Sequence, residues 1–73
     1  MSLIMEIKDA LRAWREEHGL SQEAVARAIN ASLSGYTNWE AGRTSGPSPA
    51  VLRRLEAFKP GLVARIFEDE DGK

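Results

Sequence analysis

Hydrophobic residues recur at helical spacing from the start of the chain, and charged residues fill the positions between them. Ile4, Ile7, Leu11 and Trp14 begin this pattern, which predicts an amphipathic helix. The helix should end near His18–Gly19, because glycine readily adopts the left-handed conformation of a helix C-terminus. The polar positions between the hydrophobic ones are Lys8, Asp9, Arg12, Arg15 and Glu16.

Two shorter helices are predicted next, each introduced by a serine that can cap its N-terminus. The second helix follows Ser21 and ends near Asn30, since asparagine tolerates the left-handed conformation. Ser32 can cap a third helix that runs to about Ala41, with Gly42 beyond it. The apolar positions of the second helix are Val25, Ala26 and Ile29.

The rest of the chain reads as a loop and two further helices. Residues 43–49, RTSGPSP, are rich in glycine, proline and hydroxyl residues, which indicates a loop. Ser48–Pro49 then begins a fourth helix that stops at residues 59–61, KPG. A short fifth helix follows, with Pro60 at or near its start. The apolar positions of these helices are Val51, Leu52, Leu55 and Phe58, then Leu62, Val63, Ile66 and Phe67.

The predicted fold class is all-α, a compact bundle of four to five short helices, because no convincing alternating strand pattern occurs. With 73 residues the chain is long enough for one small domain, which we place at residues 1–67. The absence of cysteine excludes a disulfide framework and a thiolate zinc site. No apolar run approaches the roughly 20 residues that span a bilayer, and residues 1–5 are too short for a secretory signal. We therefore expect a cytoplasmic, nucleoid-associated protein without a membrane partner.

The net charge of −1 conceals an uneven distribution of charged residues. Four of the 11 acidic residues lie at positions 68–71, and one of the 10 basic residues is Lys73. Residues 1–67 therefore hold nine basic and seven acidic residues. The simplest interpretation of residues 68–73 is an acidic, frayed and solvated tail. The alternative is that these acids repel DNA from that end of the molecule.

The third predicted helix combines two large aromatic residues with a small polar face. Tyr36 and Trp39 are three residues apart and share one side of the helix, where they can pack with the second helix. The opposite and flanking positions are Leu33, Ser34, Thr37 and Asn38. Two short helices joined by the turn at residues 30–32 have the spacing of a helix-turn-helix. The aromatics would anchor the helix, so that its small polar face can enter a DNA groove.

Residues 20–43, LSQEAVARAINASLSGYTNWEAGR, resemble the helix-turn-helix of the lambda-repressor-like (Cro/XRE-type) DNA-binding domains. The resemblance extends over roughly residues 5–67. The matching features are LSQ, Ala26, Ile29, Ser32 at the cap of the recognition helix, Trp39–Glu40, and Gly42 with a basic residue after it. It implies binding to double-stranded DNA.

The resemblance also implies a role for individual residues. Gln22 matches a family glutamine that binds a DNA phosphate, and Ser21 with the backbone N–H groups of that helix end would assist it. Asn38 could bond bidentately to adenine, and Leu33 could pack on a thymine methyl group. The base-reading positions are Leu33, Ser34, Asn38 and Thr37. The phosphate contacts are Ser21, Gln22, Arg43, Thr44 and Ser45.

Three residues of the third helix depart from the family pattern: Leu33, where a polar or basic residue is commoner, Gly35 and Tyr36. Gly35 costs about 1 kcal/mol of helix propensity relative to alanine, but it allows close approach to a groove. Tyr36 stands where valine or isoleucine is usual, so its hydroxyl must reach a hydrogen-bond partner or the surface.

These features predict a small bacterial or phage transcriptional repressor that binds DNA sequence-specifically as a dimer. The half-sites of its operator would lie about one helical turn, roughly 34 Å, apart. A hypothesis for the dimer interface is Leu62, Val63, Ile66 and Phe67, with Leu3 and Ile4 as additions. The alternative is that these residues complete the core of the domain.

A second function class stays open: an antitoxin-like or adaptor protein that mainly binds a partner protein and uses DNA binding for autoregulation. An enzyme is not expected, because the chain has one histidine, no cysteine and no glycine-rich phosphate loop. The sequence likewise predicts no catalytic residue, no metal site and no cofactor.

Overall fold

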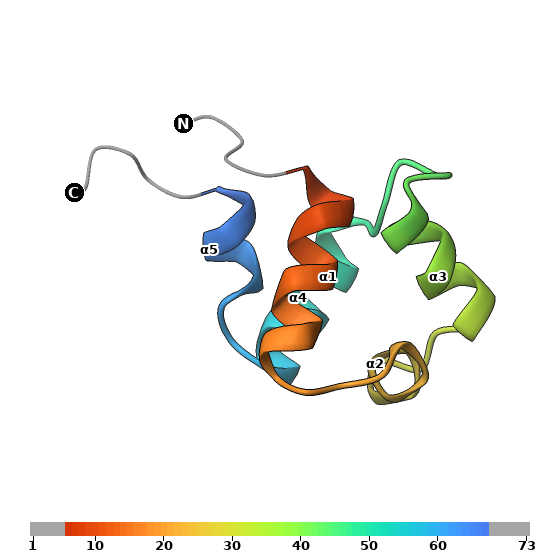
Figure 1. Cartoon of the computed structure of the whole chain (residues 1–73), viewed down its shortest axis with the longest axis horizontal. Helices are drawn as coiled ribbons and strands as arrows, with labels where there is room; N and C mark the ends of the chain where they lie inside the picture. Colours follow the sequence, from red (N-terminus) through yellow and green to blue (C-terminus); the bar gives the residue numbers. More distant parts are fainter. Residues whose placement is uncertain (1–5, 68–73) are drawn as a thin grey trace.

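The computed structural model describes residues 6–67, which form five helices packed around one core (Figure 1). The helices are α1 (Ile7–Glu17), α2 (Gln22–Ala28), α3 (Leu33–Ala41), α4 (Pro49–Phe58) and α5 (Leu62–Ile66). No strand occurs within residues 6–67. The all-α prediction is therefore confirmed, and the helix ends predicted within residues 6–67 agree with the structure to within about two residues. The start of the first helical pattern at Ile4 lies outside the described residues.

Serine caps begin three of the five helices, as the sequence predicts. The side-chain oxygens of Ser21, Ser32 and Ser48 each accept the backbone N–H of the third residue that follows. Pro49 occupies the first turn of α4, where its missing N–H costs nothing. Asn30 has φ of 60° in the turn between α2 and α3, the left-handed conformation expected of it.

Helix α1 lies in the middle of the molecule and connects its two sides. It packs against α3 on one side and α5 on the other, while α2 packs on α3 and α4 packs on α5 (Figure 1). The helix-turn-helix pair α2–α3 therefore lies at the opposite end of the molecule from α5. The buried core consists of Ala10, Leu11, Trp14, Val25, Ala26, Ile29, Tyr36, Leu55, Leu62 and Ile66.

The hypothesis for the dimer interface needs a correction at two of its four residues. Leu62 and Ile66 have no exposed surface and belong to the core of the monomer, because this face of α5 packs on α1 and α4. Val63 and Phe67 are 36% and 39% exposed. The suggested additions Leu3 and Ile4 and the acidic residues 68–73 lie outside the described residues.

The start of α5 is held by a side chain of the preceding helix. The carboxylate of Glu56 in α4 accepts the backbone N–H groups of Gly61 and Val63, at 3.0 and 2.9 Å. The hydrogen bond from Val63 is the main reason why the pKa of the Glu56 carboxyl lies below its ordinary value. This carboxylate supplies the N-terminal cap that Gly61, with no side chain, cannot provide.

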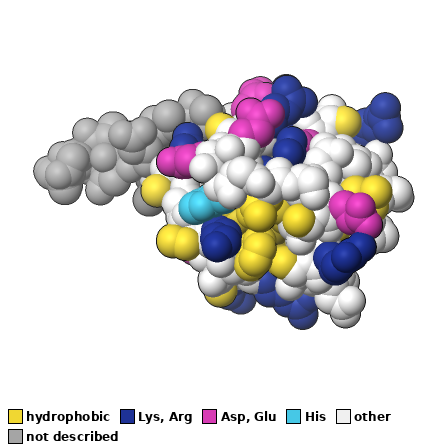
Figure 2. All heavy atoms as spheres, turned by 60° about the horizontal axis from the view of Figure 1, so that its bottom comes forward, with side chains coloured by type: hydrophobic (Ala, Val, Ile, Leu, Met, Phe, Trp, Pro, Cys, Tyr) yellow, Lys and Arg dark blue, Asp and Glu magenta, His cyan; other side chains and the backbone are white. Residues whose placement is uncertain are grey.

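The face that carries α2 and the turn before it has hydrophobic side chains at its centre, with both basic and acidic side chains around them (Figure 2). A shallow hollow lies between α2 and α4. Its lining residues are Ala28, Ile29, Asn30, Arg54, Ala57 and Phe58. The residues that the sequence assigns to DNA contacts do not line this hollow.

Candidate nucleic-acid interface

Helix α3 is anchored through its aromatic side. Tyr36 is fully buried, whereas Trp39 is half-buried and packs against the edge of the core. Their rings meet edge to face, with the ring centroids 5.8 Å apart. The prediction that both aromatics build the shared interior is thus confirmed for Tyr36 and holds in part for Trp39.

The other side of α3 carries the four residues that the sequence assigns to base reading. Leu33 is 46% exposed, Ser34 is exposed, and Thr37 and Asn38 are half-buried. The Thr37 hydroxyl donates to the Ser34 carbonyl at 3.0 Å, so it is already bonded to its own helix. All four residues thus lie on one short helix, but their side chains differ in how many hydrogen bonds they can still offer to a ligand.

A buried carboxylate on α3 joins this helix to the two helices before it. Glu40 is 3% exposed. Its Oε2 accepts the Nε–H of Arg15 at 2.7 Å and the hydroxyl of Tyr36 at 2.6 Å. Its Oε1 accepts Nη2–H of Arg15 at 3.1 Å and Nε2–H of Gln22 at 3.0 Å. We call Glu40, Arg15, Tyr36 and Gln22 the Glu40 cluster.

The protonation states within the Glu40 cluster follow from these hydrogen bonds. Burial is the largest influence on the pKa of Glu40 and raises it, yet the hydrogen bonds from Arg15, Tyr36 and Gln22 together bring the pKa below its ordinary value. Burial, and then the bond to Glu40, raise the pKa of the Tyr36 hydroxyl far above its ordinary value. At neutral pH Glu40 is thus ionised and Tyr36 is protonated, which is the combination these hydrogen bonds require.

The roles of Arg15 and Glu40 do not follow from the sequence pattern. Arg15 occupies a polar position of an amphipathic helix, yet its side chain is only 14% exposed, and it also donates to the carbonyl of Leu20 at 2.8 Å. One signal was present. Tyr36 needs a partner for its hydroxyl, and Glu40 lies one helical turn later on the same face.

Of the two predicted phosphate contacts at the start of α2, Gln22 belongs to the Glu40 cluster and Ser21 directly precedes it. Gln22 is the first residue of α2, and Ser21 caps that helix by accepting the N–H of Ala24. Gln22 is half-buried because its amide reaches inward to Glu40. One N–H of the Gln22 amide is used in this way, and the Ser21 side chain stays exposed.

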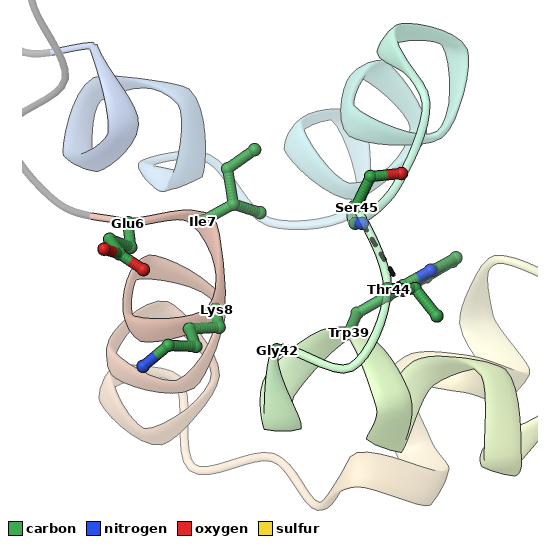
Figure 3. A pocket seen from close by; sticks show the side chains of 8 residues that line it. Glu6, Ile7, Lys8, Trp39, Gly42, Thr44 and Ser45 are labelled. Carbon is green, nitrogen blue, oxygen red and sulfur yellow. Dashed lines mark hydrogen bonds between the residues drawn. The ribbon is translucent and has the colours of Figure 1, made fainter.

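The remaining predicted phosphate contacts follow α3 in an exposed loop. Arg43, Thr44 and Ser45 are all exposed, and Arg43 Nη1 lies 3.4 Å from Asn38 Oδ1. A cavity of about 300 Å³ separates this loop from the first turn of α1 (Figure 3). Its lining residues are Glu6, Ile7, Lys8, Trp39, Gly42, Thr44, Ser45 and Gly46. The loop thus places a cation and two hydroxyl groups directly after the C-terminus of α3.

Gly42 ends α3 with φ of 75°, and the stem of Lys8 crosses directly over it. A Cβ atom added at Gly42 would lie 2.6 Å from Lys8 Cδ. Both the left-handed backbone and the close side chain therefore favour glycine here. This glycine, which the sequence places beyond the third helix, fixes the direction in which the loop leaves α3.

A comparison with protein-family models agrees with this geometry. A model described as Helix-turn-helix matches residues 11–58, which is more than half of the chain. The chain belongs to the Cro/C1-type helix-turn-helix family. Neither the search of curated proteins nor the search of solved structures gives a significant match.

Membership of the helix-turn-helix family indicates a DNA-binding function of the transcription-regulator kind, and the proteins of this family are typically not enzymes. The matched residues include all of α2, α3 and the loop that follows them. Within residues 6–67, no helix has the length and hydrophobicity needed to cross a membrane.

Proposed function

We propose that this protein is a small bacterial or phage transcriptional repressor that binds double-stranded DNA sequence-specifically and inserts α3 into the major groove. The observation that carries the proposal is the division of α3 into two sides. Tyr36 and Glu40 are buried on one side, whereas the other side presents short side chains that let the helix backbone come close to base edges. Anchoring through buried partners keeps that side free for the groove.

We assign base reading to Leu33, Ser34, Thr37 and Asn38, with Asn38 as the main polar reader. Thr37 is the weaker candidate because its hydroxyl already donates to the Ser34 carbonyl. The Asn38 amide can both donate and accept, which suits the N6 and N7 atoms of adenine. Leu33 is exposed and apolar, which suits the methyl group of thymine.

We assign phosphate binding to the two segments that flank α3. Ser21 and Gln22 lie before the turn of the helix-turn-helix, and Arg43, Thr44 and Ser45 follow α3. Contacts on both sides of a recognition helix would fix its position in the groove without reading sequence. Arg43 contributes a full positive charge. Its contribution to DNA affinity should therefore decrease as the salt concentration rises.

We propose that the protein acts in the cytoplasm on a two-fold-related operator, with Val63 and Phe67 in the dimer interface. Val63 lies on α5 and Phe67 directly follows this helix, and both side chains are exposed. Helix α5 lies at the end of the molecule opposite α3 (Figure 1). A contact between two copies there would leave both recognition helices free. Half-sites about 34 Å apart would then meet the two helices on one face of the duplex.

Selection from a pool of randomised duplexes tests this proposal. We expect a two-fold-related sequence to be enriched, and Asn38→Ala to relax the preference at one base position per half-site. Losing a good bidentate contact should reduce discrimination there by about 1–3 kcal/mol. Gln22→Ala is the matched control, because the Gln22 side chain bonds to Glu40 and not to Asn38, and its loss should weaken binding to all sequences alike. If no sequence is enriched, a protein-binding role of the antitoxin or adaptor kind replaces the repressor.

A further inference from the structure

We propose that Glu40 is the positioning residue for the phosphate contact of Gln22. The inference rests on the proposed function, since it requires a DNA phosphate at the start of α2. Glu40 lies on the recognition helix α3, whereas Gln22 begins α2. Their hydrogen bond of 3.0 Å therefore joins the phosphate-binding side chain directly to the base-reading helix.

The chemistry of the two groups fixes which way the Gln22 amide is turned. An ionised carboxylate accepts hydrogen bonds but cannot donate one, so the amide must present its NH₂ group to Glu40. One N–H is used by Glu40 Oε1, and the second has no acceptor among residues 6–67. A phosphate oxygen also accepts hydrogen bonds only. The orientation that satisfies Glu40 thus keeps an N–H, rather than the amide oxygen, available for DNA.

Glu40 is suited to this task because its own carboxylate is fixed. Arg15 holds both carboxylate oxygens through a side-on pair of hydrogen bonds, and the Tyr36 hydroxyl holds Oε2. The residue is 3% exposed. A Gln22 amide bonded to this group is already ordered before DNA arrives, so less side-chain entropy is lost on binding.

A second variant of the Glu40 cluster serves as a matched control. It shows what happens when Glu40 loses a hydrogen bond other than the one to Gln22. Tyr36→Phe removes a donor to Oε2, whereas Gln22 is bonded to Oε1. This variant weakens the hold on Glu40 without touching the Gln22 bond. Because Arg15 still holds both carboxylate oxygens in this variant, Tyr36→Phe should lower stability but leave DNA affinity within about twofold of the wild type. Glu40→Gln, in contrast, removes the charge that fixes the orientation of the Gln22 amide.

A double-mutant cycle tests the proposal. The wild type, Gln22→Ala, Glu40→Gln, the double variant and Tyr36→Phe are titrated with the selected duplex, after circular dichroism has shown each to be folded. We expect Gln22→Ala to weaken binding about tenfold, Glu40→Gln to weaken it nearly as much, and the double variant to be no weaker than Gln22→Ala. Losses that multiply in the double variant would overturn the proposal, because Glu40 would then act independently of Gln22.

A measurement on the wild type keeps the test valid if Glu40→Gln does not fold. In NMR spectra of the free protein, the Gln22 Nε2 proton that bonds to Glu40 should lie outside the range of solvent-exposed glutamine amides and should exchange slowly with water, and adding duplex should shift the other Nε2 proton. Two Gln22 amide protons that resemble those of an exposed glutamine, or no shift with DNA, would overturn the proposal. If the protein binds DNA sequence-specifically but gives either of these negative results, only the role of Glu40 is refuted and the repressor function stands. The absence of any preferred sequence refutes the repressor function and this inference together.

Discussion

Arg15 of α1 and Glu40 of α3 form an ion pair in the interior of the domain. Arg15 Nε lies 2.7 Å from Glu40 Oε2, and Arg15 Nη2 lies 3.1 Å from Glu40 Oε1. The two side chains are 14% and 2% exposed. The pair therefore ties α1 to the C-terminal half of α3, and breaking it would leave a charge in a site that water hardly reaches.

Arg15→Met should lower the free energy of unfolding by about 3–5 kcal/mol, because it leaves the Glu40 carboxylate buried without its cation. Urea denaturation followed by circular dichroism measures this loss. Arg27→Met is the matched control. Its partner Glu23 lies one helical turn away, and both side chains are more than 60% exposed, so the change should stay within about 0.5 kcal/mol. A loss below about 1 kcal/mol for Arg15→Met would contradict the structural role of the pair.

Acid should destabilise the fold through Glu40 and Glu56. Both carboxyls have folded-state pKa values below their ordinary value. Their contribution to stability is therefore present above the unfolded-state pKa, and it is lost as pH falls through the folded-state values. The thermal midpoint should be nearly constant between about pH 7 and 5 and should then decline. Glu56→Gln should make this decline shallower, and an unchanged pH profile would contradict the cap that Glu56 provides to α5.

Gly35→Ala should change the free energy of unfolding by different amounts with and without the Ser32 cap of α3. A Cβ atom at Gly35 would lie 2.9 Å from the Ser32 hydroxyl oxygen, which accepts the Gly35 N–H. In the wild type, the gain of about 1 kcal/mol in helix propensity should be offset by a disturbed cap. In a Ser32→Ala background, which itself costs about 1 kcal/mol, the full gain should appear. Equal effects of Gly35→Ala in both backgrounds, measured by urea denaturation, would contradict this coupling.

Val63→Asp should weaken binding to a complete operator while leaving binding to a single half-site unchanged. The Val63 side chain is 36% exposed and is not needed to fill the core. A carboxylate there would have to be desolvated if two copies meet on α5. Electrophoretic mobility shifts with one and two half-sites measure the difference. Ala57→Asp, on the exposed side of α4, is the control, and it should change the affinity for neither duplex. If Val63→Asp weakened binding to both duplexes equally, Val63 would lie outside the dimer interface.

Local signals in the sequence predict the helices well. Ser21, Ser32 and Ser48 cap helices because each side-chain oxygen satisfies an N–H group only three residues away. Asn30 takes the left-handed conformation for reasons contained in its own side chain. The small polar face of α3 is predictable for the same reason, since helical spacing alone opposes it to Tyr36.

Features that depend on tertiary contacts could not be predicted in this way. Arg15 and Glu40 are 25 residues apart in sequence, and a charged residue on an amphipathic helix is ordinarily exposed to solvent. Only the crossing of α1 and α3 shows that the two meet. The same limit applies to α5, where Leu62 and Val63 are adjacent hydrophobic residues but only Leu62 is directed into the core.

The proposed function requires that this domain reads a DNA sequence through α3. A titration of the wild-type protein with the selected duplex and with a scrambled duplex, at several salt concentrations, tests this requirement. We expect the selected duplex to bind at least about 10³-fold more tightly at physiological salt. Equal affinities for the two duplexes, with dissociation constants of about 10⁻⁴–10⁻⁶ M, would contradict it.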